Sequence, residues 1–191
     1  MNSVNCTNDC LIMFRVIDEP MVGLKLLEPC IFEDTRGLFI KSYHSRLWSE
    51  LGIKFSLEEE FYSISKKDVI RGMHFQLPPY AHDKVVYCIS GEVLDVVLDM
   101  RKDSNTYGQS FALSLSAANR QILYIPRGFA HGFLSLSEAS CMVYKTNTIY
   151  VPEFDAGICW DSFGFEWPVL NPIVSDRDAE FPRNTNFTSP F

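Results

Sequence analysis

The 191-residue sequence contains no apolar run of about 18 residues, so it predicts no transmembrane helix. Its first residues lack a basic segment followed by a long apolar core, so no secretory signal is expected. Basic side chains are scarce: 17 Lys and Arg face 24 Asp and Glu, a net charge of −7 that argues against nucleic acid as a partner. A nucleotide ligand is still allowed, because a few arginines suffice for one diphosphate.

Cysteines are few, and none of the six forms a CxxC pair. Cys88, Cys141 and Cys159 lie in apolar segments, where a free thiol behaves as a small hydrophobe. Cys6 and Cys10 lie in a polar N-terminal segment, where we also expect free thiols. This usage fits a reducing compartment, and the cytoplasm is the simplest expected location.

Hydrophobic residues make up 47% of the chain, enough for one domain with a sizeable core. Residues 1–20 show little periodicity and are expected to form an N-terminal extension. Residues 21–182 are expected to form the domain, and residues 183–191 a loose C-terminal tail, because that end is rich in Pro, Asn, Thr and Ser. No linker or internal repeat divides the domain.

Short β-branched segments separated by Gly and Pro turns predict a β-sandwich or barrel. The expected strands are residues 23–27, 38–43, 61–65, 69–76, 85–89, 93–98, 111–115, 121–125, 131–136 and 141–146. Segments 85–89 and 93–98 flank Ser90-Gly91-Glu92 and predict a hairpin. One helix is expected at 45–52, with Ser45 as its N-cap and Gly52 as its terminator.

Two of the expected strands carry a histidine among polar residues, His74 after Arg71-Gly72 and His131 before Gly132. These histidines are expected to point into one cavity of a β-barrel. A metal-binding barrel would need a second histidine two residues after the first, where this chain has Gln76. With His82 assigned to a loop at the surface or rim, a metal lacks ligands, so no metal is expected.

Polar side chains interrupt several core strands. They are Arg71, His74, Gln76, Lys84, His131, Tyr144 and Lys145. Any one of them fits a solvated strand face, but buried charge is costly, so the set predicts a polar cavity. Proton abstraction next to a carbonyl needs a base, an oxyanion stabiliser and an acid on the opposite face. His74, Lys84 and Tyr144 supply these three chemistries.

The sequence resembles the dTDP-4-dehydrorhamnose 3,5-epimerases, a family of sugar-nucleotide epimerases, because it carries many of their motifs in the same order and at the same spacing. The matching segments are 34–37, 70–76, Lys84, 91–101, 104–108, 125–133, 143–145, 150–153 and 175–178. The resemblance covers about residues 22–182. It implies an all-β fold, a cupin-type jelly-roll β-barrel or sandwich with a few short helices. It also implies a homodimer with exchanged strands and chemistry without a metal or a redox cofactor.

The resemblance further implies roles for individual residues. His74 matches the catalytic base, Asp178 the carboxylate paired with it, Lys84 the lysine near the sugar ketone, and Tyr144 the general acid. Substrate contacts are implied or expected for a larger set: Arg36 and Arg71 at the diphosphate, His131 and Tyr150 in the pocket, and Gln76 and Arg177 beside them.

Three positions depart from the family pattern. Lys41 stands where the rhamnose enzymes usually have glutamate, and Glu59 and Phe61 stand where they usually have glutamine and asparagine. In the family these positions belong to the nucleoside end of the pocket. We therefore expect a changed nucleotide preference, CDP in place of dTDP, with Glu59 accepting a bond from an exocyclic amine. The alternative is that the three residues only repack the wall.

The expected function is an isomerase that inverts carbon 3, carbon 5 or both of a nucleotide-linked 4-keto-6-deoxyhexose in deoxysugar biosynthesis. One alternative is a single-centre 3- or 5-epimerase for a CDP-linked, even 3,6-dideoxy, sugar. A 3,4-ketoisomerase of similar barrel fold would also use a histidine base. A metal-dependent cupin oxygenase lacks its ligand at Gln76, and a pure binding module would not need a base and an acid together. The expected partners are the nucleotide sugar and a second copy of the chain, with no nucleic acid and no membrane.

Overall fold

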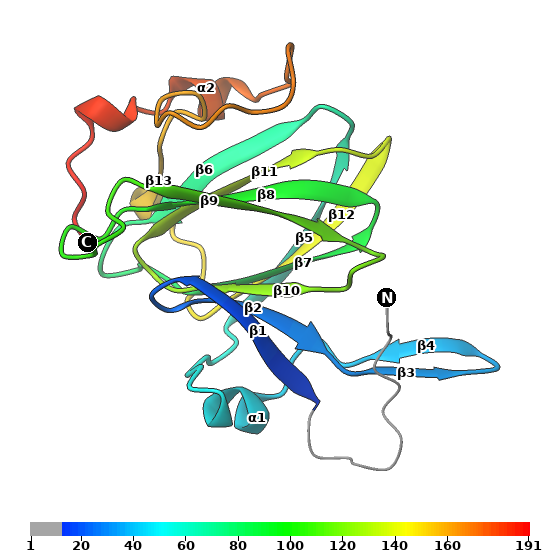
Figure 1. Ribbon diagram of the computed structural model, residues 1–191. Helices are drawn as coiled ribbons and strands as arrows, with labels where there is room; N and C mark the ends of the chain where they lie inside the picture. The colour runs from blue at the N-terminus through cyan, green and yellow to red at the C-terminus, as the bar shows by residue number, and fades with distance from the viewer. Residues whose placement is uncertain (1–12) are drawn as a thin grey trace.

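The computed structural model describes residues 13–191, which form a sandwich of two β-sheets (Figure 1). The first sheet contains, from edge to edge, β1 (Phe14–Met21), β2 (Leu24–Pro29), β10 (Ile122–Ile125), β7 (Lys84–Ser90), β12 (Ala139–Thr146) and β5 (Glu59–Lys66). The second contains β13 (Asp155–Gly157), β6 (Ile70–Gln76), β11 (Phe129–Ser135), β8 (Glu92–Asp99) and β9 (Ser110–Ser116). The expected all-β fold is confirmed.

The remaining elements are short. They are the separate hairpin of β3 (Ile31–Asp34) and β4 (Gly37–Ile40), the helices α1 (Ser45–Glu50) and α2 (Asp176–Glu180), and the 3-10 turns η1 (Pro152–Phe154) and η2 (Asn184–Asn186). No helix in residues 13–191 is long and apolar enough to cross a membrane.

The predicted hairpin of residues 85–98 is wrong, although both of its strands form. β7 pairs with β10 and β12, whereas β8 pairs with β11 and β9 in the other sheet. The chain changes sheets at Gly91, where φ is +73° and a Cβ would lie 2.4 Å from the Ala139 carbonyl oxygen. The strands then bury their apolar faces against each other in the core between the sheets.

The outer face of each sheet is covered. The segment with α1 packs Trp48, Ile53 and Phe55 against the six-stranded sheet, and the C-terminal segment packs against the five-stranded sheet (Figure 1). The N-cap of α1 is His44, whose side chain accepts a bond from the backbone N–H of Leu47, so the predicted cap was one residue late. The predicted terminator Gly52 is confirmed, with φ +77° just after the last helical turn.

Both ends of the described chain differ from expectation. The C-terminal tail packs instead of being loose: Phe187 and Phe191 meet the Phe75 ring at 5.5 and 5.8 Å between centroids. β1 lies inside the expected N-terminal extension; its burial does not alternate regularly and its pairing with β2 contains register shifts, so no period-2 signal announced it. Cys6, Cys10 and the other residues of the range 1–12 lie outside the described residues. The expected free thiols of Cys88, Cys141 and Cys159 are confirmed.

Two glycines let the strands with the histidines approach closely. At Gly72 on β6, where φ is +148°, a Cβ would lie 2.5 Å from the Cα of Gly132 on β11. Any larger residue at these positions would push the strands apart. Beside this close approach, His131 on β11 lies directly opposite His74 on β6 in the ladder.

Candidate active site

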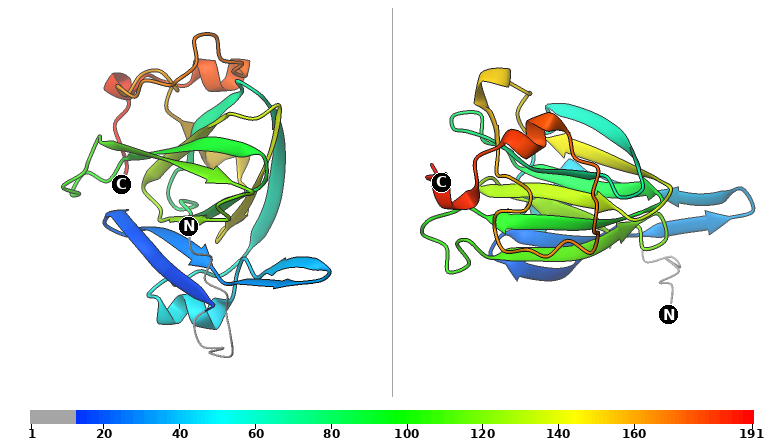
Figure 2. Two further views of the ribbon diagram at one scale, coloured as in Figure 1. Left: turned by 45° about the vertical axis from the view of Figure 1, so that its right-hand side comes forward. Right: turned by 90° about the horizontal axis from the view of Figure 1, so that it is seen from above.

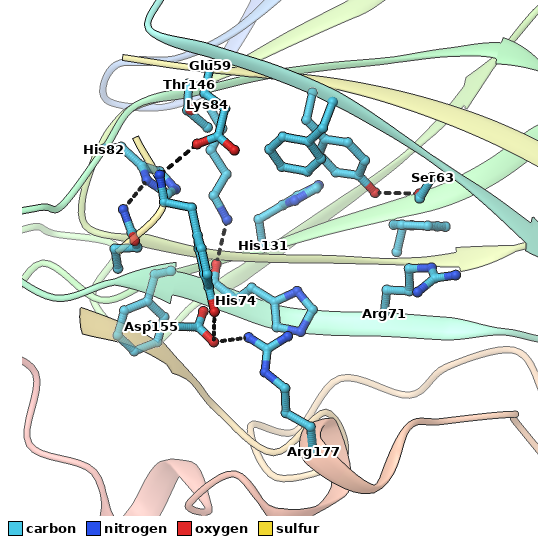
Figure 3. A pocket seen from close by; sticks show the side chains of 16 residues that line it. Glu59, Ser63, Arg71, His74, His82, Lys84, His131, Thr146, Asp155 and Arg177 are labelled. Atoms are coloured by element: carbon cyan, nitrogen blue, oxygen red, sulfur yellow. Dashed lines mark hydrogen bonds and ion pairs between the residues drawn. The ribbon is translucent and has the colours of Figure 1, made fainter. Parts of the chain in front are cut away.

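A cavity of about 380 Å³ takes its walls from both sheets (Figure 3). It is lined by Glu59, Phe61, Ser63, Arg71, His74, Phe75, Gln76, His82, Lys84, His131, Phe133, Tyr144, Thr146, Tyr150, Asp155 and Arg177. Ten of the expected site residues are in this list. Asp178 lies immediately behind the wall, and only Arg36 and Lys41 lie elsewhere.

His74 is held by Asp178 across 104 residues of sequence. Its Nε2 lies 2.8 Å from Asp178 Oδ1, and the other carboxylate oxygen accepts the backbone N–H of Gly72 at 3.1 Å. Asp178 is fixed at the start of α2, where its own N–H donates to the Ser175 hydroxyl. The carboxylate therefore accepts a hydrogen bond from the Nε2–H of a neutral His74, which leaves Nδ1 free to accept a proton.

The electrostatics of this pair keep the imidazole neutral. Burial lowers the pKa of His74 below the ordinary histidine value, and the bond and charge of Asp178 offset part of that effect. Burial would raise the pKa of Asp178, but the hydrogen bonds from His74 and Gly72 outweigh it, and the pKa falls below the usual aspartate value. A neutral base beside an ionised carboxylate is the protonation state that proton abstraction requires.

Lys84 lies beside the histidine. Its Nζ donates to the backbone carbonyl of His74 at 2.9 Å. Burial lowers the pKa of Lys84 to about 8, while the charges of Asp155 and Asp95 act in the opposite direction. The ammonium is therefore still mostly charged at neutral pH, and it can stabilise negative charge that develops within the cavity.

Tyr144 comes from the facing sheet. It lies on β12, and its hydroxyl shares a 3.2 Å hydrogen bond with Ser63 on β5. Phe61, two residues before Ser63, stacks on the phenol with centroids 4.8 Å apart and planes 12° apart. Burial raises the pKa of Tyr144 far above that of a free phenol, so the hydroxyl keeps its proton. The cavity thus has a proton acceptor on one sheet and a protonated phenol on the other.

A second histidine pair lies deeper. His131 Nε2 lies 2.8 Å from Asp95 Oδ2, and both side chains are almost fully buried. Burial raises the pKa of Asp95. The ring of His131 meets that of Tyr144 edge-on, with centroids 6.3 Å apart. This pair therefore fixes the wall between His74 and the Tyr144 phenol.

Gln76 organises the neighbouring wall. Its Oε1 accepts the Val151 N–H at 2.7 Å, and its Nε2 donates to the Tyr80 carbonyl and to His82 Nδ1, each at 3.0 Å. His82 lines the cavity, so its expected place at the surface or rim is wrong. Burial, followed by the charge of Lys84, lowers its pKa to about 3. The loop is polar in sequence but folds inward over Gln76.

Charged and polar groups surround the opening. Arg177 forms an ion pair with Asp155, which also accepts a bond from the Tyr150 hydroxyl at 3.5 Å. Arg71 is anchored by the Ser65 hydroxyl at 3.0 Å and is otherwise exposed. Figure 3 shows Glu59 and Thr146 on one side of the cavity and Arg177 on the other. The two guanidinium groups can therefore meet an anion entering from the rim.

Arg36 and Lys41 are not brought to this cavity. Arg36 lies on the turn between β3 and β4, is 88% exposed and pairs with Asp34 at 2.5 Å. Lys41 directly follows β4. Conversely, Ser63, Thr146 and Asp155 line the cavity but were missed in the sequence. Ser63 lies two residues after Phe61 on β5 and so shares its inward face, and the alternation of side chains along a strand could have predicted it. Nothing in the sequence around Asp155 predicts its place in the cavity.

Metal-binding donors do not gather here. In the part of the chain that the structure describes, no group of three or more His, Cys, Asp or Glu side chains is arranged to hold a metal ion.

The β-sandwich and its histidine–aspartate pair opposite a tyrosine fit the class of sugar-nucleotide epimerases. The family model described as dTDP-4-dehydrorhamnose 3,5-epimerase matches residues 18–186. The chain belongs to this family and is an isomerase. A relative of that name from Shigella flexneri is 44% identical over 167 residues, 86% of this chain and 92% of its own. One from Methanothermobacter thermautotrophicus is 39% identical, with 88% and 93% covered.

Solved structures agree with this assignment. The Bacillus anthracis dTDP-4-dehydrorhamnose 3,5-epimerase with TDP and PPi bound has a TM-score of 0.87 at 38% identity, covering 89% of this chain and 99% of its own. The Legionella pneumophila 3,5-epimerase in complex with dTDP-4-keto-L-rhamnose has a TM-score of 0.85 at 34% identity, covering 89% and 92%. The expected family and cupin-type fold are confirmed.

Proposed function

We propose that the protein inverts carbon 3, carbon 5 or both of a nucleotide-linked 4-keto-6-deoxyhexose, with His74 as base and Tyr144 as acid. The observation that carries this proposal is the position of the two groups on facing sheets of one cavity. Inversion requires a proton to leave one face of a carbon and another to arrive on the opposite face. A mere binding site would not need this arrangement.

The reaction follows from the contacts. The ketone at carbon 4 acidifies the C–H bonds on both neighbouring carbons, and His74 Nδ1 takes one of these protons. The electron pair moves to the ketone oxygen as an enolate, which the charged Lys84 stabilises. When the electron pair returns to carbon, the Tyr144 hydroxyl supplies the new proton from the other side. His74 then loses a proton to solvent and Tyr144 regains one, so the enzyme is restored.

Two observations favour different nucleotides for the substrate. The relatives and solved neighbours described above carry dTDP or TDP in their names, which favours a dTDP sugar. Glu59, which replaces the family's glutamine, lines the cavity, and a free carboxylate oxygen suits the exocyclic amine of cytosine. However, its Oε2 already accepts the Tyr150 N–H at 2.6 Å, which supports a role in the wall. We take dTDP as the first candidate and CDP as the second.

The 4-keto-6-deoxyglucose sugars of dTDP and of CDP, offered separately in deuterated water, are expected to separate these possibilities by proton NMR. Exchange marks each carbon that His74 deprotonates. Deuterium with inverted configuration at carbons 3 and 5 identifies a 3,5-epimerase, and at one carbon a single-centre enzyme. The faster sugar identifies the nucleotide. A ketone that moves to carbon 3 would identify a ketoisomerase, and exchange with neither sugar would refute the proposed function.

We also propose a homodimer in which the β3–β4 hairpin reaches the cavity of a second copy. The hairpin projects from the sandwich in all three views (Figures 1 and 2) and exposes 61% of Phe39 and 47% of Leu38. The edge strand β5 exposes Tyr62 and Ile64 by 68% and 63%. An exposed apolar edge of this kind normally meets a partner. The assembly would bring Arg36 to a diphosphate, the role that resemblance implies.

Arg36→Ala is expected to raise KM for the nucleotide sugar about tenfold or more while the dimer persists, because a charge-assisted contact to phosphate is lost. Arg46→Ala, an exposed arginine on α1, serves as the matched control and should change nothing. Phe39→Asp should shift the chain towards monomer in sedimentation and raise KM as well. A monomeric wild type, or a dimer in which Arg36→Ala keeps its KM, would contradict the proposed assembly.

A further inference from the structure

Phe61 lines the cavity, yet no step of the proposed reaction uses it. Resemblance assigns its position to the nucleoside end of the pocket, but its ring lies on the phenol of Tyr144, with centroids 4.8 Å apart and planes 12° apart. The two residues are direct partners in the ladder between β5 and β12. Side chains of such partners are near neighbours, so the pairing of the strands itself places one ring over the other.

The Tyr144 phenol is held by three neighbours. Phe61 covers one face of its ring, and the ring of His131 meets it edge-on, with centroids 6.3 Å apart. Ser63, on the same strand as Phe61, shares the 3.2 Å hydrogen bond with the hydroxyl. The hydrogen bond restrains the oxygen, whereas the two rings restrict tilting of the phenol plane. Together these contacts set the orientation in which the phenol offers its proton.

Phe61 also separates the phenol from solvent. β5 is an edge strand of the six-stranded sheet, and among residues 13–191 no strand pairs with its outer side. Phe61 is 45% exposed, whereas Tyr144 on the next strand is 8% exposed. This burial raises the pKa of Tyr144 and keeps its hydroxyl protonated. A smaller side chain at position 61 would therefore both loosen the phenol and admit water to it.

We propose that Phe61 is a positioning residue for the acid, and that its stacked ring sets how often the enolate takes its proton from Tyr144. The inference rests on the proposed function, because it takes His74 as the base and Tyr144 as the acid. The enolate has two outcomes. Either its electron pair returns to carbon and takes the Tyr144 proton, which inverts the centre, or it takes the proton back from His74 on the original face. A phenol that is free to tilt offers its proton to the carbon less often, so the second outcome gains.

The test is the ratio of these two outcomes in deuterated water, measured as initial rates by proton NMR. His74 is partly exposed and exchanges its proton with solvent, so each return to the original face leaves deuterium in the recovered substrate. Phe61→Leu keeps an apolar side chain without the ring. It is expected to raise the ratio of labelled substrate to inverted product about fivefold, the typical contribution of a stacked aromatic pair. A misfolded fraction or weaker substrate binding would lower both rates equally and leave this ratio unchanged.

Three further variants test whether the ring acts through the phenol. Phe61→Trp keeps an aromatic ring, for which the half-exposed position has room, and should stay within about twofold of the wild-type ratio. Phe61→Leu added to Tyr144→Phe should change neither rate further, because the group on which Phe61 acts is already absent. Lys66→Ala is the matched control, since Lys66 is exposed at the far end of the same strand, and it should equal the wild type.

An unchanged ratio in Phe61→Leu would overturn the inference. So would a Phe61→Trp variant whose ratio equals that of Phe61→Leu, because the aromatic ring would then not be the cause. A further change when Phe61→Leu is added to Tyr144→Phe would show that Phe61 acts on another group, and would overturn it as well. Wild-type protein without exchange or inversion would refute the proposed function, whereas wild-type inversion with an unchanged ratio in Phe61→Leu counts against this inference alone.

Discussion

Tyr144→Phe is expected to lose inversion by on the order of 10²–10⁴ while the substrate still exchanges deuterium from solvent. The phenol hydroxyl is the proposed proton source on the face opposite His74, and phenylalanine keeps the stacked ring against Phe61 without it. His74, whose side chain is 27% exposed, can still take a proton, exchange it with water and return deuterium to the same face. Proton NMR in deuterated water reads exchange and configuration in one spectrum.

A comparison of Tyr144→Phe with His74→Ala tests which residue is the acid and which is the base. His74→Ala should lose exchange and inversion together, because no enolate forms. Ser63→Ala, which removes only the hydroxyl bonded to the phenol, should slow inversion less than Tyr144→Phe does. If Tyr144→Phe inverts at the wild-type rate, Tyr144 is not the acid. If it loses exchange as completely as His74→Ala, the phenol acts before the enolate forms.

Local signals in the sequence were sufficient for ten of the thirteen strands in residues 13–191 and for part of the cavity wall. Short apolar segments bounded by turns identified β6 and β11, and the histidines on them lie opposite each other in one ladder. The cavity-lining side chains of β5 (Phe61 and Ser63) and of β12 (Tyr144 and Thr146) are spaced two residues apart, as expected for one face of a strand. Side-chain direction within a strand is a local property, so it could be inferred without knowledge of the fold.

Contacts between segments that are distant in the sequence are not a local property, and most of the wrong or missing predictions concern such contacts. β7 and β8 have hairpin-like sequences, yet burial of their apolar faces across the core separates them into different sheets. His82 looked like a surface histidine because nothing in its loop indicates that Gln76 draws it inward. Asp178 was paired with His74 only through resemblance, since no spacing rule connects residues so far apart. Arg36 lies on an exposed turn, and its proposed place at a diphosphate requires the proposed second copy of the chain.

Asp178→Asn is expected to lower kcat/KM by on the order of 10²–10⁴, mainly by changing the tautomer of His74. The Gly72 N–H, a donor, faces one terminal atom of the side chain, so the amide oxygen of asparagine belongs there. The amide NH₂ then faces His74 Nε2, which must accept. The imidazole proton moves to Nδ1, and the atom that should take the substrate proton is already protonated.

The same substitution should shift the pH profile in a defined direction. The acid limb of kcat/KM reports ionisation of His74 in the free enzyme, and burial already places its pKa below the ordinary histidine value. The Asp178 charge raises that pKa, so its removal must lower it further, and the acid limb of Asp178→Asn moves to lower pH. The basic limb, set by loss of charge on Lys84 with a pKa of about 8, should stay in place and serves as an internal reference.

Asp176→Asn is the matched control, because Asp176 lies in the first turn of the same helix but is exposed and makes no contact with His74. Its rate and both limbs should equal those of the wild type. If the loss of a negative charge near the N-terminus of α2 were the cause, the acid limb would move in both variants. If the direct contact between Asp178 and His74 is the cause, it moves in Asp178→Asn alone. An acid limb that stays fixed, or rises, in Asp178→Asn would mean that the ionisation belongs to another group and that His74 is not the base.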